Sequence, residues 1–242
     1  MPNLYSNAND GYIQTPIAPA WAAARDATSG SSGSTSGTSS TYFTEVSRFG
    51  GRGANQYRVS RSFMYFDTSG ITATVTAATI KIHGATGNDG SVIAVKSTAF
   101  GGDGGTALAM ADFNAITGYS TGSSLAGNAT DYSDTITGTS WSTTAKNDLT
   151  GTSALRTDMQ NDNVVIICFM DYTNDYLNSA PGTAATLNYG AYYTDYGGTS
   201  RDPLIEYTIA TGYGHEVNSV AAANIAKVNG IATADISKVN GV

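Results

Sequence analysis

Short runs of β-branched and aromatic residues recur along this chain of 242 residues, and glycine, serine, asparagine or aspartate bounds each run. Such runs are typical of β-strands, and their boundaries are typical of turns. The clearest runs are residues 57–66, 79–84, 91–96, 164–170, 187–193 and 204–209. No alternation of strands with long helical patterns connects them. We therefore expect an all-β fold, a jelly-roll-type β-sandwich.

The composition agrees with this expectation. Charged residues make up 13% of the chain, and only 3 residues are glutamate, so the usual helix formers are scarce. Glycine contributes 28 residues, and serine and threonine together contribute 58, which suits strands and turns. We expect only short helices, at residues 21–25 and within 148–159.

Alternation of apolar residues predicts the core. The run 164–170 is almost continuously apolar, which predicts a strand buried on both faces. Within it, Cys168 is expected to be a buried and inert thiol. A one-residue shift of register in the run 57–66 would exchange Phe63 and Tyr65 for Met64 and Phe66. The predicted interior consists of Phe63, Tyr65, Ile80, Ile82, Val165, Ile167 and Phe169.

The pattern divides the chain into a β-sandwich domain, residues 1–212, and a tail, residues 213–242. Residues 29–41 contain only serine, glycine and threonine, so we expect a flexible loop there. Gly87-Asn88-Asp89-Gly90 separates two strand-like runs and predicts a β-hairpin.

The tail contains an internal repeat. Val217-Asn218-Ser219-Val220, Val228-Asn229-Gly230-Ile231 and Val239-Asn240-Gly241-Val242 recur at a spacing of 11 residues. The spacers are rich in alanine and end in lysine, which predicts short helical turns closed by Asn-Gly. A β-solenoid and a frayed tail are the alternatives.

A helix of one or two turns is not stable alone, so each repeat is expected to dock on a partner. The partner would be another virion protein, such as a major capsid protein, or a second copy of this chain, which predicts a homo-oligomer. The expected interface residues are Val220, Ile225, Val228, Ile231, Ile236, Val239 and Val242.

The sequence offers little catalytic chemistry, and we expect no enzyme. The two histidines, His83 and His215, lack the spacing of a zinc site, and no nucleophile elbow or phosphate-binding loop occurs. Glu45 and Glu206 have no spacing signal for a glycosidase pair. No metal or cofactor is expected, although Asp89 and Asp103 lie in turns of the kind that hold Ca²⁺.

Two classes of partner are disfavoured. The formal net charge of −7 disfavours binding to nucleic acid. No apolar run approaches the 18 residues of a membrane-spanning helix. Glycans remain open as partners, because tyrosine rings stack on sugars. The candidate glycan-binding residues are Tyr189, Tyr192, Tyr193 and Tyr196.

Three stretches resemble the DNRLRE-like, or carbohydrate-binding-module-like, jelly-roll domains of phage virion proteins and secreted carbohydrate-binding proteins. The first is Asn9-Asp10-Gly11-Tyr12-Ile13 with Trp21 and Arg25. The second runs from Arg61 to Ile71 and continues through residues 77–82. The third covers residues 198–207. The terminal Lys-Val-Asn-Gly repeats resemble the tails of phage structural proteins.

The resemblance implies a non-enzymatic component of a tailed-phage virion, such as a capsid decoration protein, a head fibre or a tail fibre. The alternative is a glycan-binding adhesin module that attaches its owner to a surface. The first residues lack the basic segment and apolar core of a secretory signal. We therefore expect a protein that is assembled into virions in the host cytoplasm.

Overall fold

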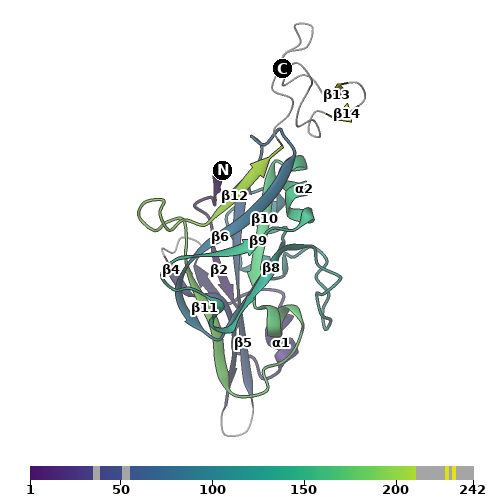
Figure 1. Ribbon diagram of the computed structural model, residues 1–242. Coiled ribbons are helices and arrows are strands. Elements are labelled where there is room, and N and C mark those ends of the chain that lie inside the picture. Colours follow the sequence, from purple (N-terminus) through teal and green to yellow (C-terminus); the bar gives the residue numbers. More distant parts are fainter. Residues whose placement is uncertain (35–38, 51–54, 211–226, 229–230, 233–242) are drawn as a thin grey trace.

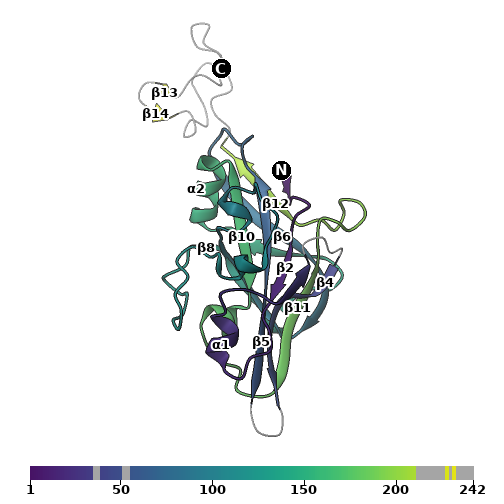
Figure 2. The same ribbon diagram turned by 180° about the vertical axis from the view of Figure 1, so that it is seen from behind.

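A computed structural model describes residues 1–34, 39–50, 55–210, 227–228 and 231–232. These residues form an all-β protein in which twelve strands belong to one antiparallel sheet (Figures 1 and 2). The strands of this sheet are β1 (Asn3–Tyr5), β2 (Gly11–Gln14), β3 (Ser32–Ser34), β4 (Ser39–Phe49), β5 (Gln56–Asp67), β6 (Val75–Asn88), β7 (Ser91–Lys96), β8 (Asp131–Thr137), β9 (Lys146–Thr150), β10 (Val164–Met170), β11 (Ala185–Tyr192) and β12 (Leu204–Ile209).

Helical segments in the described residues are few and short, as the composition predicts. The α-helices are α1 (Trp21–Arg25) and α2 (Ser153–Asn161). The single-turn segments are the 3₁₀ turns η1 (Phe100–Gly102), η2 (Met110–Asn114) and η3 (Gly138–Ser140) and the π turn η4 (Tyr172–Tyr176). Helix α2 begins where the hydroxyl of Thr152 accepts a hydrogen bond from the N–H of Leu155, at 3.3 Å.

The sheet divides at β5. Ser60 of β5 pairs with β2 on one side and with β4 on the other, whereas Ser62 pairs with β2 and β10. Strands β4 and β10 therefore follow one another along the same edge of β5. Beyond this point the order β4-β11-β6-β12-β1 continues one half of the sheet, and β10-β7-β8 continues the other. The sheet curls so that the two halves face each other, as in half a barrel.

Strand β8 also contacts the segment that follows β9. Strand β9 pairs with β6, and an isolated bridge joins Ser133 of β8 to Gly151, directly after β9. The N–H of Thr152 donates to the carbonyl oxygen of Tyr132 at 3.0 Å beside this bridge. The two ends of the curled sheet are thus held together at one point.

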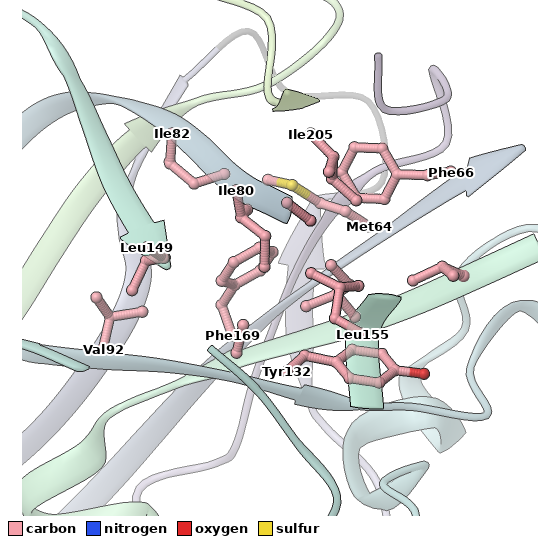
Figure 3. Packing of buried hydrophobic residues seen from close by; sticks show 14 of the residues in the cluster. Met64, Phe66, Ile80, Ile82, Val92, Tyr132, Leu149, Leu155, Phe169 and Ile205 are labelled. Atoms are coloured by element: carbon pink, nitrogen blue, oxygen red, sulfur yellow. The ribbon is translucent and has the colours of Figure 1, made fainter. Parts of the chain in front are cut away.

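Two hydrophobic clusters occupy the two faces of β5 and β10. The inner cluster lies between the halves of the sheet and includes Met64, Phe66, Ile80, Ile82, Val165, Ile167 and Phe169 (Figure 3). The outer cluster includes Phe63, Tyr65, Ile166 and Cys168. All the predicted core residues are buried, but Met64 and Phe66 take the interior places predicted for Phe63 and Tyr65.

A layer of short helical segments explains why both faces of β5 are buried. Ala24 of α1, Phe100 of η1, Phe113 of η2 and Tyr176 of η4 all belong to the outer cluster. This layer covers the face of β5 and β10 that a simple two-sheet sandwich would leave in water. Cys168 is buried beneath it, as predicted, and burial raises the pKa of its thiol.

The prediction of a flexible loop over residues 29–41 is wrong at residues 32–34 and 39–41, which form strands. Strand β3 pairs with β2, and β4 already begins at Ser39. Small residues in this segment allow neighbouring backbones to approach closely. A Cβ at Gly33 would lie 2.3 Å from the carbonyl oxygen of Tyr12, so only glycine fits there.

The predicted hairpin at residues 87–90 is also absent from the described sheet. Strand β6 pairs with β9, β11 and β12, whereas β7 pairs with β8 and β10. The turn therefore carries the chain from one half of the sheet to the other. Asp89 has a left-handed φ of 46° in this crossing.

Candidate functional site

The four candidate tyrosines do not share one surface. Tyr189 and Tyr193 are fully buried. The ring of Tyr189 stacks on Trp141 at 4.6 Å, and the hydroxyl of Tyr193 lies 2.7 Å from that of Ser62. Neither ring is accessible to a saccharide. Alternation along the end of β11 leaves Tyr192 at the surface, between the buried residues Ala191 and Tyr193. Tyr196 lies at the surface in the turn after this strand.

The two outward tyrosines belong to a tyrosine surface cluster that also contains Arg201 and His83. The guanidinium carbon of Arg201 lies 4.4 Å from the ring centre of Tyr192 and 4.7 Å from that of Tyr196. Arg201 also donates a hydrogen bond to the Tyr196 hydroxyl at 2.9 Å. The imidazole of His83 meets the Tyr192 ring edge to face at 5.2 Å. No motif singled out Arg201, which lies in the loop between β11 and β12 and reaches these rings.

The cluster favours anions over sugar stacking. Arg201 covers a face of each tyrosine ring, and within the described residues it forms no ion pair with a carboxylate. Its guanidinium has five N–H donors, so donors remain for an anionic group. The arrangement is a fixed cation on an aromatic base.

The two calcium candidates lie in separate turns. Asp103 follows η1, and its Oδ1 accepts a hydrogen bond from the N–H of Gly105 at 2.8 Å. Asp89 lies in the crossing between β6 and β7 and forms a bridge with Asn188. Over the described part of the chain, no three side chains of His, Cys, Asp or Glu gather as a metal site requires.

A buried arginine site lies beneath the outer layer, and sequence reasoning missed it. Arg25, Arg61 and Asp175 are all fully buried. Arg61 donates two hydrogen bonds of 2.7 Å to the two carboxylate oxygens of Asp175. Arg25 donates from Nε to the carbonyl oxygen of Asp175 at 2.7 Å. The available signal was an arginine in the middle of the predicted strand 57–66, since a charged residue that a strand buries requires a partner.

Further contacts complete this site. Arg61 donates to the carbonyl oxygens of Phe113 and Arg25 at 2.9 and 3.1 Å. Burial by itself lowers the pKa of Arg61, but the charge of Asp175 more than offsets it, so the pKa is raised and the cation persists. The hydroxyl of Tyr119 donates to Asp26 at 2.7 Å, and burial raises the pKa of Tyr119 to about 12. These bonds fasten α1, η2 and η4 to β5, which is a structural role.

Other acidic groups are also committed to the fold. Glu45 is buried and accepts hydrogen bonds from Arg58 at 2.8 and 2.9 Å. Glu206 lies on β12, 4.0 Å from Lys81. These two glutamates therefore belong to different ion pairs on different strands.

Asp10 and Asp171 are buried carboxylates whose charged forms are disfavoured. Burial raises the pKa of each to about 6, against the opposing hydrogen bonds. Those bonds come from Thr194 and Ser6 to Asp10, and from Ser91 and Asn174 to Asp171. Both aspartates therefore hold a proton in the folded state at a pH where the unfolded chain has lost it.

These two carboxylates predict a pH dependence of stability. Between about pH 4 and pH 6 the folded state binds more protons, so the free energy of unfolding falls as pH rises. Each group contributes on the order of 2–3 kcal/mol to this fall. Denaturant unfolding at pH 5 and pH 7.5 should show the wild-type chain more stable at pH 5. Asp10→Asn with Asp171→Asn should flatten the difference, and a wild-type chain that is more stable at pH 7.5 would contradict the assignment.

The expected docking residues fall mostly outside the described chain. Val220, Ile225, Ile236, Val239 and Val242 lie there, while Val228 and Ile231 are described. Val228 lies in β13 (Lys227–Val228) and pairs with Ile231 in β14 (Ile231–Ala232). Lys227, Val228, Ile231 and Ala232 thus form paired strands. The prediction that a helical turn ends at Lys227 and Val228 is therefore wrong. Extended β-branched residues on each side of Asn-Gly account for this, because that dipeptide favours two-residue hairpin loops.

The comparisons with known proteins place the chain in no family. No protein-family model matches it, and no curated protein matches it either. Within the described residues, no helix has the length and apolar character needed to cross a membrane.

Proposed function

We propose that this protein is a non-enzymatic structural component of a tailed-phage virion, a capsid decoration or a fibre-like appendage. Its β-sandwich, of jelly-roll type with two facing sheet halves, would be the body. Residues 213–242 would hold it to other virion proteins, such as the major capsid protein, or to its own copies. Assembly would take place in the host cytoplasm.

The pair of strands β13 and β14 in the tail carries this proposal. Strands β13 and β14 form a sheet of their own, separate from the twelve-stranded sheet. A two-stranded hairpin alone is marginally stable in water at best. The Val-Asn-Gly/Ser sequence at its centre recurs three times at a spacing of 11 residues. A series of such units gains stability by pairing with a partner.

The buried charged residues support a role without catalysis. Asp175, Arg61 and Glu45 are all engaged in ion pairs that hold the fold together.

The test compares the full chain with a chain that ends at Gly212. Sedimentation velocity should show an oligomer for the full chain and a monomer for the shortened one, and only the full chain should bind particles that lack this protein. Val228→Asp with Ile231→Asp in the full chain should reproduce the loss. Its control is Thr208→Asp with Ile209→Asp at the end of β12, which adds the same two charges to the main sheet. Oligomers and particle binding that survive both tail changes would refute the proposal.

A glycan-binding adhesin is the second candidate, and the tyrosine surface cluster is the observation that favours it. Tyr192 and Tyr196 are half-buried and lie beside Arg201. An aromatic surface with a fixed cation suits a saccharide that carries a carboxylate.

A further inference from the structure

A cavity of about 600 Å³ opens near the end of α2, away from the buried arginine site. The end of β7, the turn after η1 and the beginning of β10 form its other walls. Ligand-binding pockets commonly have volumes of about 300–1,000 Å³, so this one has room for a small molecule. Its principal polar lining residues are Lys96, Thr98, Asp103, Asn161, Asp162 and Asn163.

One rim of the cavity is held firmly in place. Phe100 has a left-handed φ of 56°, which is uncommon for a bulky residue. Its ring is fully buried and lies 5.0 Å from that of Tyr65. A Cβ at Gly104 would lie 2.9 Å from the same ring, so this turn follows the surface of Tyr65 closely. The turn therefore presents Asp103 to the cavity from a fixed backbone.

The charges at the cavity disfavour an anion, and Lys96 already pairs with two of the carboxylates. Lys96 Nζ lies 2.9 Å from Asp158 and 3.5 Å from Asp162. Burial by itself lowers the pKa of Lys96, but the two aspartates raise it overall, so the ammonium group persists. Asp103 adds a third carboxylate at the rim, which repels an anion. The ammonium group occupies the place between Asp158 and Asp162 that a metal ion would need.

The remaining lining suits hydroxyl groups. Among the described residues, the side chains of Thr98, Asn161 and Asn163 make no hydrogen bonds with the protein, and all three are exposed. Amide and hydroxyl groups both donate and accept hydrogen bonds, as sugar hydroxyls do. Val164 and Ile166 add apolar surface to the lining, against which the C–H face of a ring can pack.

We propose that this cavity binds a neutral saccharide. The proposal does not depend on a virion role or on the tail, and it places the saccharide away from the tyrosine surface cluster. Uncharged polyols match the mixture of donors, acceptors and aliphatic surface. A carboxylated sugar would meet the carboxylate at the rim and would fit Arg201 instead.

The experiment titrates the full-length, isotope-labelled protein by NMR. The probes are neutral disaccharides of glucose, galactose, mannose and N-acetylglucosamine, a diuronic acid and CaCl₂ alone. At least one neutral disaccharide should bind and shift the resonances of residues 96–103 and 161–166. Asn161→Ala with Asn163→Ala should weaken that binding tenfold or more, and Asp103→Ala should weaken it from the opposite rim. The matched control is Tyr192→Ala with Tyr196→Ala, which should leave the affinity unchanged.

Several outcomes would overturn the proposal. One is that no neutral disaccharide binds. Another is that binding follows the tyrosine pair instead of the asparagine pair. Binding of only the diuronic acid, or of calcium at the cavity, would equally reject a neutral saccharide. Because saccharide binding and oligomeric state are separate measurements on the full chain, failure of this inference is distinguishable from failure of the structural role.

Discussion

Replacing Asp175 with alanine is expected to lower the free energy of unfolding by about 3–5 kcal/mol. The substitution leaves the guanidinium of Arg61 buried without its two 2.7 Å bonds to a carboxylate. The nearby guanidinium of Arg25 loses its 3.5 Å contact with the same carboxylate but keeps its ion pair with Asp26. A small domain has about 5–15 kcal/mol of stability in total, so the loss is a large part of it. Equilibrium unfolding in urea, followed by tryptophan fluorescence, measures the effect.

Asp148→Ala provides the matched control. Asp148 forms an ion pair with Lys81 at 2.8 Å, but its side chain is 56% exposed. Water already solvates both charges, so the expected loss is about 1 kcal/mol or less. Equal losses in the two variants would show that the buried arginine site does not hold the outer layer on the sheet.

Replacing Ile167 with alanine is expected to cost about 2–5 kcal/mol. Ile167 is fully buried in the inner cluster, and β10 pairs with β5 and β7 on its two sides. The strand is held by both neighbours, so the backbone has little freedom to close the space left by the side chain. Unfolding in urea again gives the difference in free energy.

Ile209→Ala is the control for this second change. Ile209 ends β12 and is 43% exposed, so its truncation should cost about 0.5 kcal/mol or less. A similarly small loss for Ile167→Ala would contradict its place in the centre of the inner cluster.

Local pattern was sufficient for six of the twelve strands of the main sheet, β5, β6, β7, β10, β11 and β12. The run 204–209 coincides with β12, and 164–170 coincides with β10, because β-branched and aromatic runs between turn residues leave little alternative. The helix at 21–25 was also predictable, since it consists of three alanines between tryptophan and arginine. The all-β class follows from these short segments alone.

Pairing partners were not predictable, because pairing depends on residues that are far apart in the chain. The turn at residues 87–90 has the composition of a hairpin, yet β6 and β7 find partners in different halves of the sheet. Residues 29–41 have the composition of a loop, yet the lack of a side chain at Gly33 is what admits the carbonyl of Tyr12. In both places tertiary contacts outweigh the local preference.

The candidate sites, too, depended partly on local pattern and partly on tertiary contacts. The sequence offered four tyrosines as equal candidates, and only the structure selects Tyr192 and Tyr196 for the surface. The buried arginine site joins residues 25, 61 and 175, and no local spacing connects them. The identity of the strands with the clearest apolar runs was thus determined by the sequence itself, because side-chain shape and period act between near neighbours. Register, the second core and every shared site were decided by the tertiary structure, because burial and charge pairing act only between segments that the fold has brought together.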